Sequence, residues 1–370
     1  MVYRKFGDLG YDVSALGFGA MRLPEDHDEA AAVIQRSFEL GVNYLDTALV
    51  YGESELKCAK ALKGWRDKVL ISTKNPCFKD PSVDGWRQRL DDSLTRLDVD
   101  CIDFYVIWHG INWGAWQEHI KGPGKVLEAA QKAKDEGLIK HIGYSVHDSP
   151  ENVVKIVETG AFEFMIVQYN LLDRSNEEAI DKAHERGMGT VVMGPVGGGR
   201  LAGLSPELAE MVPGGVASNP EAALRFVLSN PSVSTAISGM GSMEMVEQNA
   251  KIASREDPMS AEERTRMEKA LDEAQKFAKL YCTACGYCMP CPHGVDIPGN
   301  FNLMNYHRVY GLTDHAKAQY ARKPTEREEG SEETKLYAGA CIECGECEPK
   351  CPQDIPIMEQ LKETHETLSS

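Results

Sequence analysis

Long apolar runs are missing from this sequence of 370 residues. No run approaches the roughly 18 apolar residues of a membrane-spanning helix, and the opening MVYRKFGDLG lacks the apolar core of an export signal. Clusters of basic residues are missing too, and the formal net charge is -17. Because nucleic acid and anionic membranes would repel such a chain, we expect neither as a partner, and we expect a cytoplasmic location.

The glycine fingerprint of many open dinucleotide-binding sheets is also missing, because GFGAMR in the first predicted strand is not G-x-G-x-x-G. Short β-branched runs alternate with helical periods eight times between residues 13 and 253, which predicts a parallel sheet with helical crossovers. Eight units fit an α/β fold closed into a (β/α)8 TIM barrel better than an open doubly wound sheet. The predicted strands cover residues 13–19, 42–48, 69–74, 101–108, 141–146, 164–170, 189–195 and 234–239.

Three other segments have recognisable patterns. Residues 3–19 place a glycine turn between short extended pieces, which predicts a hairpin that closes the bottom of the barrel. Asp28 precedes a helical period that ends at Gly41, so we expect Asp28 to cap that helix. The stretch 313–335 is polar and charged, which predicts a solvated excursion.

Four polar residues lie at or just after predicted strand ends, where barrels carry their functional side chains. Asp46, Lys74 and His109 mark the ends of the second, third and fourth strands, and Tyr51 follows Asp46 by five residues. In the stretches GVNYLDTALVYGESE, VLISTKNP and FYVIWHG the sequence resembles the aldo-keto reductases, and the resemblance covers roughly residues 1–255. It implies hydride exchange between NAD(H) or NADP(H) and a small carbonyl or alcohol substrate.

The chemistry of carbonyl reduction agrees with these residue types. Hydride addition leaves an alkoxide that needs a proton, and a tyrosine donates one when its pKa, ordinarily near 10, is lowered. A lysine cation beside Tyr51 would favour the phenolate, Asp46 would keep Lys74 charged, and His109 would orient the substrate oxygen. We therefore predict that Tyr51 is the general acid–base. A purely structural scaffold would not explain why four polar groups converge at strand ends.

By the same resemblance, the later strand ends hold the nicotinamide cofactor. The implied cofactor residues are Ser145, Gln168, Met193, Gly194, Ser238, Gly239 and Asn249. Val146 stands where the family commonly has an asparagine after the serine, and Met193 stands where many members have an aromatic residue. In the last segment no Lys or Arg precedes Lys251, so a 2′-phosphate would lack its usual basic partner and we expect a preference for NADH. Glycines 197–199 either approach the pyrophosphate or form a flexible loop.

An insert, INWGAWQEHIKGPG, follows the fourth predicted strand and would overhang the barrel mouth. Trp108, Trp113 and Trp116 in and beside it either give the substrate site an aromatic wall or pack against the protein's own surface. The sequence leaves both interpretations open.

Eight of the eleven cysteines lie in two tight runs after residue 280, an arrangement typical of metal ligands. The runs are Cys282, Cys285, Cys288 and Cys291, and then Cys341, Cys344, Cys347 and Cys351. The second run has the spacing of bacterial ferredoxins, in which the fourth cysteine of each run binds the other [4Fe–4S] cluster. We predict one cluster on Cys282, Cys285, Cys288 and Cys351, and a second on Cys341, Cys344, Cys347 and Cys291. Two zinc sites are the alternative. Cys58, Cys77 and Cys101 stand apart and are expected to be ordinary barrel residues.

The separation of the two runs resembles that in helical ferredoxins attached to larger oxidoreductases. A helix that opens with Ser260 and Glu263 at capping-box spacing leads into the first run. We therefore expect a barrel over residues 1–258, a connecting helix over 259–280 and a mostly helical, ferredoxin-like domain over 281–370.

A nicotinamide transfers two electrons together, whereas an iron–sulfur cluster transfers one. Either a flavin joins them, although no residue pattern indicates one, or the clusters serve a reduction that needs single electrons, or they are structural or redox-sensing. The main hypothesis is a reductase with ferredoxin or another electron carrier as partner. The alternative is an electron-transfer or redox-sensing subunit whose barrel binds a nicotinamide nucleotide without turnover.

Overall fold

The computed structural model describes residues 1–77, 80–171, 173–196, 219–256, 258–277, 282, 288–308, 310–326, 335–351 and 355–370. These residues form two compact units, which are described separately. The first comprises the described part of Met1–Gly199 together with Ala223–Ser260. The second comprises the described part of Ala261–Ser370, with that of residues 200–222. In the part of the chain that the structure describes, no helix has both the length and the apolar character needed to cross a membrane.

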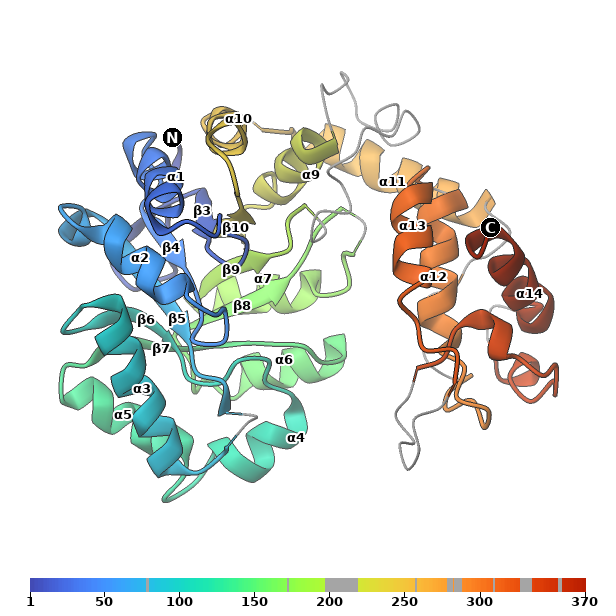
Figure 1. Ribbon diagram of the computed structural model, residues 1–370, viewed down its shortest axis with the longest axis horizontal. Helices are drawn as coiled ribbons and strands as arrows, with labels where there is room; N and C mark the ends of the chain where they lie inside the picture. The colour runs from blue at the N-terminus through green and yellow to red at the C-terminus, as the bar shows by residue number, and fades with distance from the viewer. Residues whose placement is uncertain are drawn as a thin grey trace. The chain divides into compact units, whose positions relative to one another are not determined.

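The first unit is a closed barrel of parallel strands, which confirms the predicted fold (Figure 1). Successive strands pair in chain order, and the last strand pairs with the first. The strands are β3 (Leu16–Gly19), β4 (Tyr44–Asp46), β5 (Leu70–Lys74), β6 (Ile102–Val106), β7 (Ile139–Ser145), β8 (Phe164–Gln168), β9 (Gly189–Met193) and β10 (Thr235–Gly239). Because all of them run the same way, their carboxyl ends share one mouth of the barrel.

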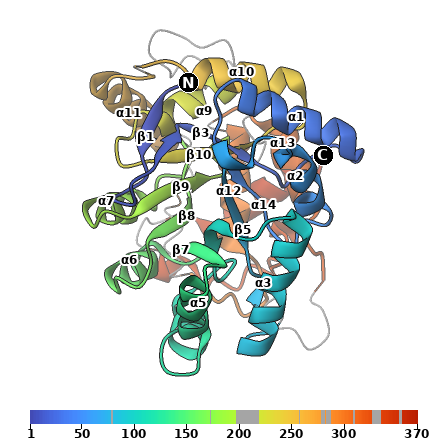
Figure 2. The ribbon, with the colours of Figure 1, turned by 90° about the vertical axis from the view of Figure 1, so that its left-hand side faces the viewer.

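Helices alternate with the strands and surround them (Figure 2). They are α1 (His27–Glu39), α2 (Ser54–Leu62), α3 (Val83–Leu97), α5 (Val126–Asp135), α6 (Pro150–Glu158), α7 (Glu177–Glu185), α9 (Asn219–Leu228) and α10 (Met243–Ala253), with short turns at α4 (Trp113–Ala115), η1 (Arg66–Lys68) and η3 (Trp116–Ile120). The predicted cap of α1 was wrong by two residues. The Asp26 carboxylate accepts hydrogen bonds from the backbone of Asp28 and Glu29, because a capping side chain must lie outside the first turn whose N–H groups it satisfies.

The predicted hairpin is confirmed, since β1 (Tyr3–Lys5) pairs antiparallel with β2 (Asp12–Ser14). Its turn carries Phe6, which is fully buried and packs edge-on against Phe104 with ring centroids 4.6 Å apart. The first residue of β9 is Gly189, where an added Cβ would lie 2.6 Å from the Phe6 ring. The hairpin therefore closes the barrel end opposite the mouth, and burial of a phenylalanine contributes about 1.5–3 kcal/mol.

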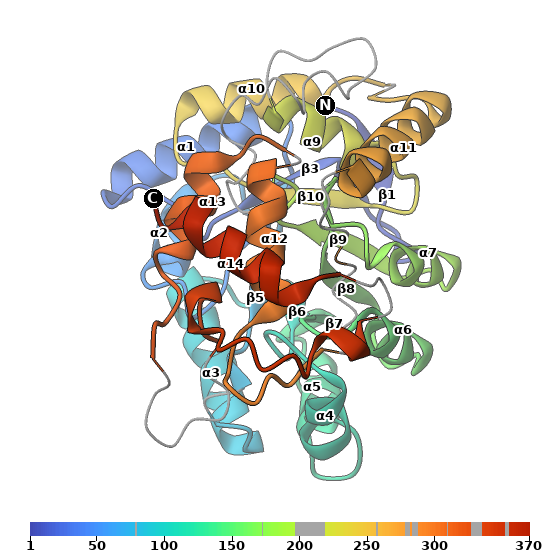
Figure 3. The same ribbon diagram turned by 90° about the vertical axis from the view of Figure 1, so that its right-hand side faces the viewer.

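The second unit is mostly helical. Its elements are α11 (Ala261–Phe277), α12 (Ile297–Arg308), α13 (Thr313–Tyr320), η5 (Ala338–Ala340), η6 (Glu348–Lys350) and α14 (Ile357–Leu368). Helices α12, α13 and α14 pack side by side (Figure 3). The prediction of a solvated excursion over 313–335 was wrong for its first part, because Ala316 and Tyr320 give α13 a buried face. The Tyr320 hydroxyl also pairs with His365 Nδ1 of α14 at 3.0 Å.

Candidate functional site

A buried ion pair lies where β4 and β5 end. Asp46 and Lys74 are the last residues of these neighbouring strands, and Lys74 Nζ lies 2.5 Å from Asp46 Oδ2. Lys74 Nζ also donates to the Thr47 carbonyl oxygen at 2.7 Å, and the Ser72 hydroxyl donates to the other Asp46 oxygen at 3.1 Å. Both charged side chains are at most 3% exposed. Such a pair fixes the position of the ammonium group, because either charge alone would be strongly disfavoured here.

Tyr51 lies above this pair in the loop that follows β4. Lys74 Nζ is 5.3 Å from the centre of the half-buried Tyr51 ring. Burial raises the pKa of Tyr51 above its ordinary value, while Lys74 lowers it and Asp46 raises it. The lysine acts in the predicted direction, but burial outweighs it, so the pKa of Tyr51 is not lowered overall. The phenol is therefore protonated at neutral pH and can donate a proton.

His109 lies beside Tyr51. Their ring centroids are 5.9 Å apart at an interplanar angle of 85°, and the His109 backbone N–H donates to Asn75 at 2.9 Å. Burial, with further contributions from Lys74 and His147, lowers the pKa of His109 to about 4. The imidazole is consequently neutral at pH 7, where it can donate a hydrogen bond but carries no extra proton.

The depressed pKa of His109 makes a prediction about stability against pH. Between the ordinary pKa of 6.5 and the folded value of about 4, the unfolded chain binds a proton at this site that the folded chain does not. Stability is therefore lost as pH falls through this window. In His109→Gln the fall of the urea midpoint between about pH 7 and 5 should be smaller than in the wild type.

Tryptophan fluorescence can report this unfolding in the barrel alone, because every tryptophan lies within residues 65–116. His184→Gln, at an exposed histidine on α7, is the matched control and should keep the wild-type pH dependence. An unchanged pH dependence in His109→Gln would contradict the lowered pKa.

The residues implied for the cofactor lie at the same mouth. Four of them end consecutive strands: Ser145 on β7, Gln168 on β8, Met193 on β9 and Gly239 on β10. Ser145 Oγ accepts a hydrogen bond from the Gly110 backbone at 2.9 Å, and Asn249 donates to Ser238 Oγ at 3.2 Å. Gly194 has a positive φ of 63° beside the Gln168 amide. The predicted glycines at 197–199 lie outside the described residues. A rim of amide and hydroxyl groups of this kind fits the polar parts of a nicotinamide nucleotide.

The insert after β6 bends back onto the protein. Ile111 forms a parallel bridge with Val146, so the insert joins the end of β7. Trp108 is buried and stacks on His119 at 5.7 Å, and Trp116 is buried against Phe162. Of the two interpretations for the tryptophans, packing on the protein's own surface therefore holds for these two, while the ring of Trp113 stays half-buried.

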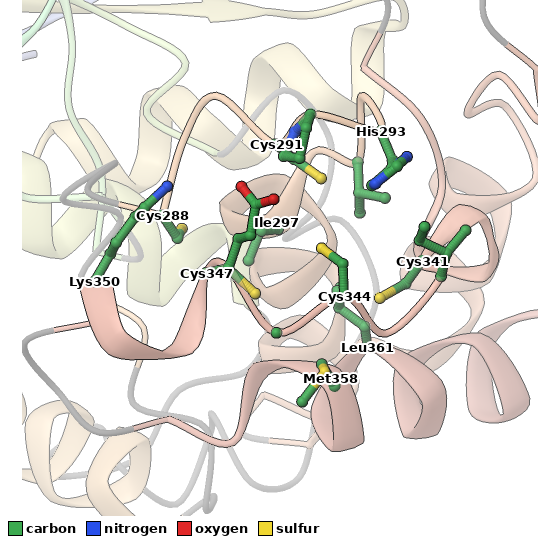
Figure 4. Close-up of a pocket in the computed structure, with 15 residues that line it drawn as sticks. Cys288, Cys291, His293, Ile297, Cys341, Cys344, Cys347, Lys350, Met358 and Leu361 are labelled. Carbon is green, nitrogen blue, oxygen red and sulfur yellow. The ribbon is translucent and has the colours of Figure 1, made fainter.

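The cysteine runs form a separate candidate centre in the second unit. One pocket is lined by five cysteines, and Figure 4 shows four of their sulfur atoms turned toward a common space. The five are Cys288, Cys291, Cys341, Cys344 and Cys347. The structure therefore brings both Cys288 and Cys291 of the first run together with the second run, whereas the predicted pairing places only Cys291 with it. Cys282 and Cys351 are described but do not line this pocket, and Cys285 lies outside the described residues.

The donor set in this pocket fits an iron–sulfur cluster. Burial raises the pKa of the Cys341 and Cys347 thiols, and the neighbouring Cys291 raises both further. Among the described residues no three His, Cys, Asp or Glu side chains are grouped to hold a single metal ion. A [4Fe–4S] cluster is larger than one ion and takes four cysteine thiolates, so binding here would displace the thiol protons. By contrast, Cys58 and Cys77 are fully buried in the barrel unit, as expected of ordinary core residues.

A cavity at the ends of β7 and β8 was not predicted. It has a volume of about 360 Å³ and is lined by polar residues, among them His147, Asp148, Gln168 and Asn176. The sequence signal for it was the run of polar residues directly after two strand ends, in SVHDS and NLLDRSN. Those residues are equally typical of loops and helix caps, so the sequence alone did not indicate a cavity. The cavity became apparent only when the structure placed them together.

Comparison with known proteins identifies the family of the barrel and the kind of the C-terminal domain. The aldo/keto reductase family model matches residues 15–272, and a 4Fe-4S dicluster domain matches residues 281–355. The chain therefore belongs to the aldo/keto reductase family, and it carries a C-terminal 4Fe-4S dicluster domain rather than the alternative pair of zinc sites. The dicluster domain implies two clusters, and the family usually uses NAD(P)H and small carbonyl substrates.

Individual relatives match most of the barrel. A solved aldo-keto reductase of Bacillus halodurans, in its holo form, is 32% identical with a TM-score of 0.64, over 73% of this chain and 96% of that one. An uncharacterised oxidoreductase of Bacillus subtilis is 28% identical over 68% of this chain and 90% of its own length. L-galactose dehydrogenase of Arabidopsis thaliana is 28% identical over 71% of this chain and 91% of its own length.

Proposed function

We propose that the barrel reduces a small carbonyl substrate, or oxidises the corresponding alcohol, with a nicotinamide nucleotide, and that the dicluster domain exchanges electrons with a carrier such as ferredoxin. The observation that carries the barrel's part is the buried Lys74–Asp46 pair beneath Tyr51, with His109 beside it. Carbonyl reduction needs a positioned proton donor and a group that orients the substrate oxygen, and these four residues supply both.

Each residue has a distinct task in this proposal. When bound, the reduced nicotinamide supplies hydride to the carbonyl carbon. Tyr51 donates its phenolic proton to the carbonyl oxygen, and the neutral His109 donates a hydrogen bond to that oxygen and orients it. Lys74 stabilises the phenolate that remains, and Asp46 keeps Lys74 in place. In alcohol oxidation the same phenolate accepts the proton.

The proposed preference for NADH rests on the segment after β10. The exposed residues at the start of α10 are Met243, Glu244 and Met245, and the first cation of the helix is Lys251 in its last turn. A 2′-phosphate near Glu244 would meet an acid rather than a base. Anaerobic turnover with NADH, NADPH or reduced ferredoxin as donor and a panel of small aldehydes tests the proposal. Clusters that are intact without turnover from any donor would overturn it.

The same sample tests whether hydride transfer in the barrel is coupled to single-electron transfer by the clusters. If NADH alone bleaches the visible absorbance of the clusters, an intramolecular route links them to the barrel, as a flavin would provide. If only dithionite or reduced ferredoxin bleaches them, electrons enter through the clusters or the two units work separately.

The proposed ligand pairing makes a prediction about iron content. We expect Cys291→Ala and Cys341→Ala each to lose about half of the bound iron, and the double variant to lose no more than either, because both residues serve one cluster. The double variant Cys288→Ala with Cys341→Ala should lose both clusters. Iron per chain, measured after anaerobic purification, decides between pairings. If Cys291→Ala with Cys341→Ala loses nearly all iron, each run holds its own cluster. Cys101→Ala is the control.

A further inference from the structure

Glu55 is a buried charge to which the proposed mechanism gives no task. It lies in the first turn of α2, four residues after Tyr51, and its side chain is 0% exposed. Both of its carboxylate oxygens have partners. The Thr73 hydroxyl donates to Oε1 at 2.7 Å, and Arg96 Nε donates to Oε2 at 3.0 Å. Because these partners lie on β5 and α3, two other elements fix the start of α2.

Arg96 makes a second contact with the same segment. Its Nη2 donates to the carbonyl oxygen of Gly52, the residue directly after Tyr51. A guanidinium group is planar and rigid, so it holds its two acceptors, on Glu55 and on Gly52, at a fixed separation. Gly52 is exposed, so water can satisfy its carbonyl oxygen equally well. The contact therefore fixes the position of the peptide after Tyr51 and does not rescue a buried acceptor.

The strand that carries Lys74 takes part in this arrangement. Thr73 and Lys74 are adjacent at the end of β5, so their side chains point to opposite faces of the barrel wall. Lys74 pairs with Asp46 and lies beneath the Tyr51 ring, whereas Thr73 meets Glu55 of α2. One strand end thus holds the ammonium group on one face and the segment that carries Tyr51 on the other.

A second ion pair on this segment has a different character. His27 Nε2 lies 3.0 Å from the Glu53 carboxylate, but the two side chains are 38% and 65% exposed. Solvent-exposed pairs of this kind restrain their partners weakly. The buried Glu55 with Arg96 is therefore the stronger restraint on the loop between β4 and α2.

We propose that Glu55 and Arg96 are positioning residues, which together hold the Tyr51 hydroxyl in place for proton transfer. The proposal rests on the proposed function, and both residues act only through Tyr51. A displacement of about 1 Å at a reacting group can cost about 100-fold in rate. Loss of this bridge should therefore lower kcat by about 10- to 100-fold. The KM for NADH should stay near the wild-type value, because no residue proposed to bind the nucleotide changes.

The double variant Glu55→Gln with Arg96→Met tests the proposal. It removes both charges at once, so no unpaired charge remains buried. Anaerobic turnover of the full cluster-loaded chain is measured with NADH and the best aldehyde, with and without Tyr51→Phe. We expect the 10- to 100-fold loss only where Tyr51 is present, because a misplaced phenylalanine has no proton to donate. A general weakening of the fold would instead lower turnover by the same factor in both backgrounds.

Arg66→Met is the matched control. Arg66 Nη1 lies 2.9 Å from Asp103, the two side chains are 30% and 1% exposed, and Arg66 Nη2 donates to the Cys101 carbonyl oxygen at 2.8 Å. This pair resembles that of Arg96, but it lies where β6 begins, at the barrel end opposite the mouth. Asp103 keeps Lys140 as a partner at 2.6 Å, so no unpaired charge remains here either. Turnover should stay near the wild-type value.

If the double variant does not fold, Thr73→Val makes the test, because it removes the hydroxyl that binds Glu55 with little change of shape. We expect a smaller loss of turnover, again confined to the background with Tyr51. Equal losses in both backgrounds, or no loss at all, would overturn this proposal alone, provided that Tyr51→Phe by itself is slow. If Tyr51→Phe turns over like the wild type, or the wild type does not turn over, the proposed function and this proposal both fail.

Discussion

Tyr51→Phe should lower turnover by about 100- to 10,000-fold while the affinity for the nicotinamide nucleotide stays unchanged. The substitution removes only the phenolic O–H, which lies beside His109 and is protonated at neutral pH. His109 cannot replace it, because its pKa of about 4 leaves almost none of the imidazole protonated at pH 7. Steady-state rates with the best aldehyde, together with nucleotide binding, measure both parts.

Tyr144→Phe is the matched control for this experiment. Tyr144 is fully buried in β7, and among the described residues its hydroxyl makes only a weak contact of 3.6 Å to the Met165 sulfur. Turnover should therefore stay near the wild-type value. The experiment also separates the two functional hypotheses. Unchanged turnover in Tyr51→Phe would contradict the proposed role of Tyr51, whereas a wild type that binds the nucleotide without any turnover would favour the electron-transfer subunit.

Lys74→Met should lower the free energy of unfolding by about 3–5 kcal/mol, because it leaves the Asp46 carboxylate buried without its partner. Burial already raises the pKa of Asp46, and Lys74 is the strongest influence that lowers it. Without Lys74, Asp46 should therefore take up a proton at higher pH than in the wild type. Urea unfolding followed by tryptophan fluorescence gives the change in the barrel.

The double variant Asp46→Asn with Lys74→Met distinguishes stability from catalysis. It removes both charges, so most of the lost stability should return, while turnover should remain low because no cation stabilises the Tyr51 phenolate. Arg87→Met is the matched control, since it breaks surface pairs with Glu136 and Asp91 in which every partner is more than a third exposed. Such a pair contributes about 0–1 kcal/mol. If the free energy of unfolding falls no further in Lys74→Met than in Arg87→Met, the prediction that burial makes the Lys74–Asp46 pair costly to break is wrong.

Local residue patterns were enough to predict the barrel. Alternation of β-branched runs with helical periods depends on neighbouring residues only, and it located all eight strands within a few residues of their structural bounds. The polar residues at strand ends could be predicted to meet for the same reason, since a closed parallel barrel brings every carboxyl end to one mouth. The position of the α1 cap and the helix α13 were missed, because several acidic residues compete for the cap and because a polar segment can still carry one buried face.

The sequence by itself determined the strand order, the polar residues at the mouth and the two cysteine runs, because each is a matter of spacing along the chain. Only the tertiary structure decided that burial outweighs Lys74 in setting the pKa of Tyr51, since desolvation depends on everything that surrounds the ring. It also brought Cys288 and Cys291 together with the second cysteine run, and it placed the Asn176 amide against the backbone oxygen of Gln168. These features arise from residues that are distant in the chain or that make contacts their local pattern does not specify.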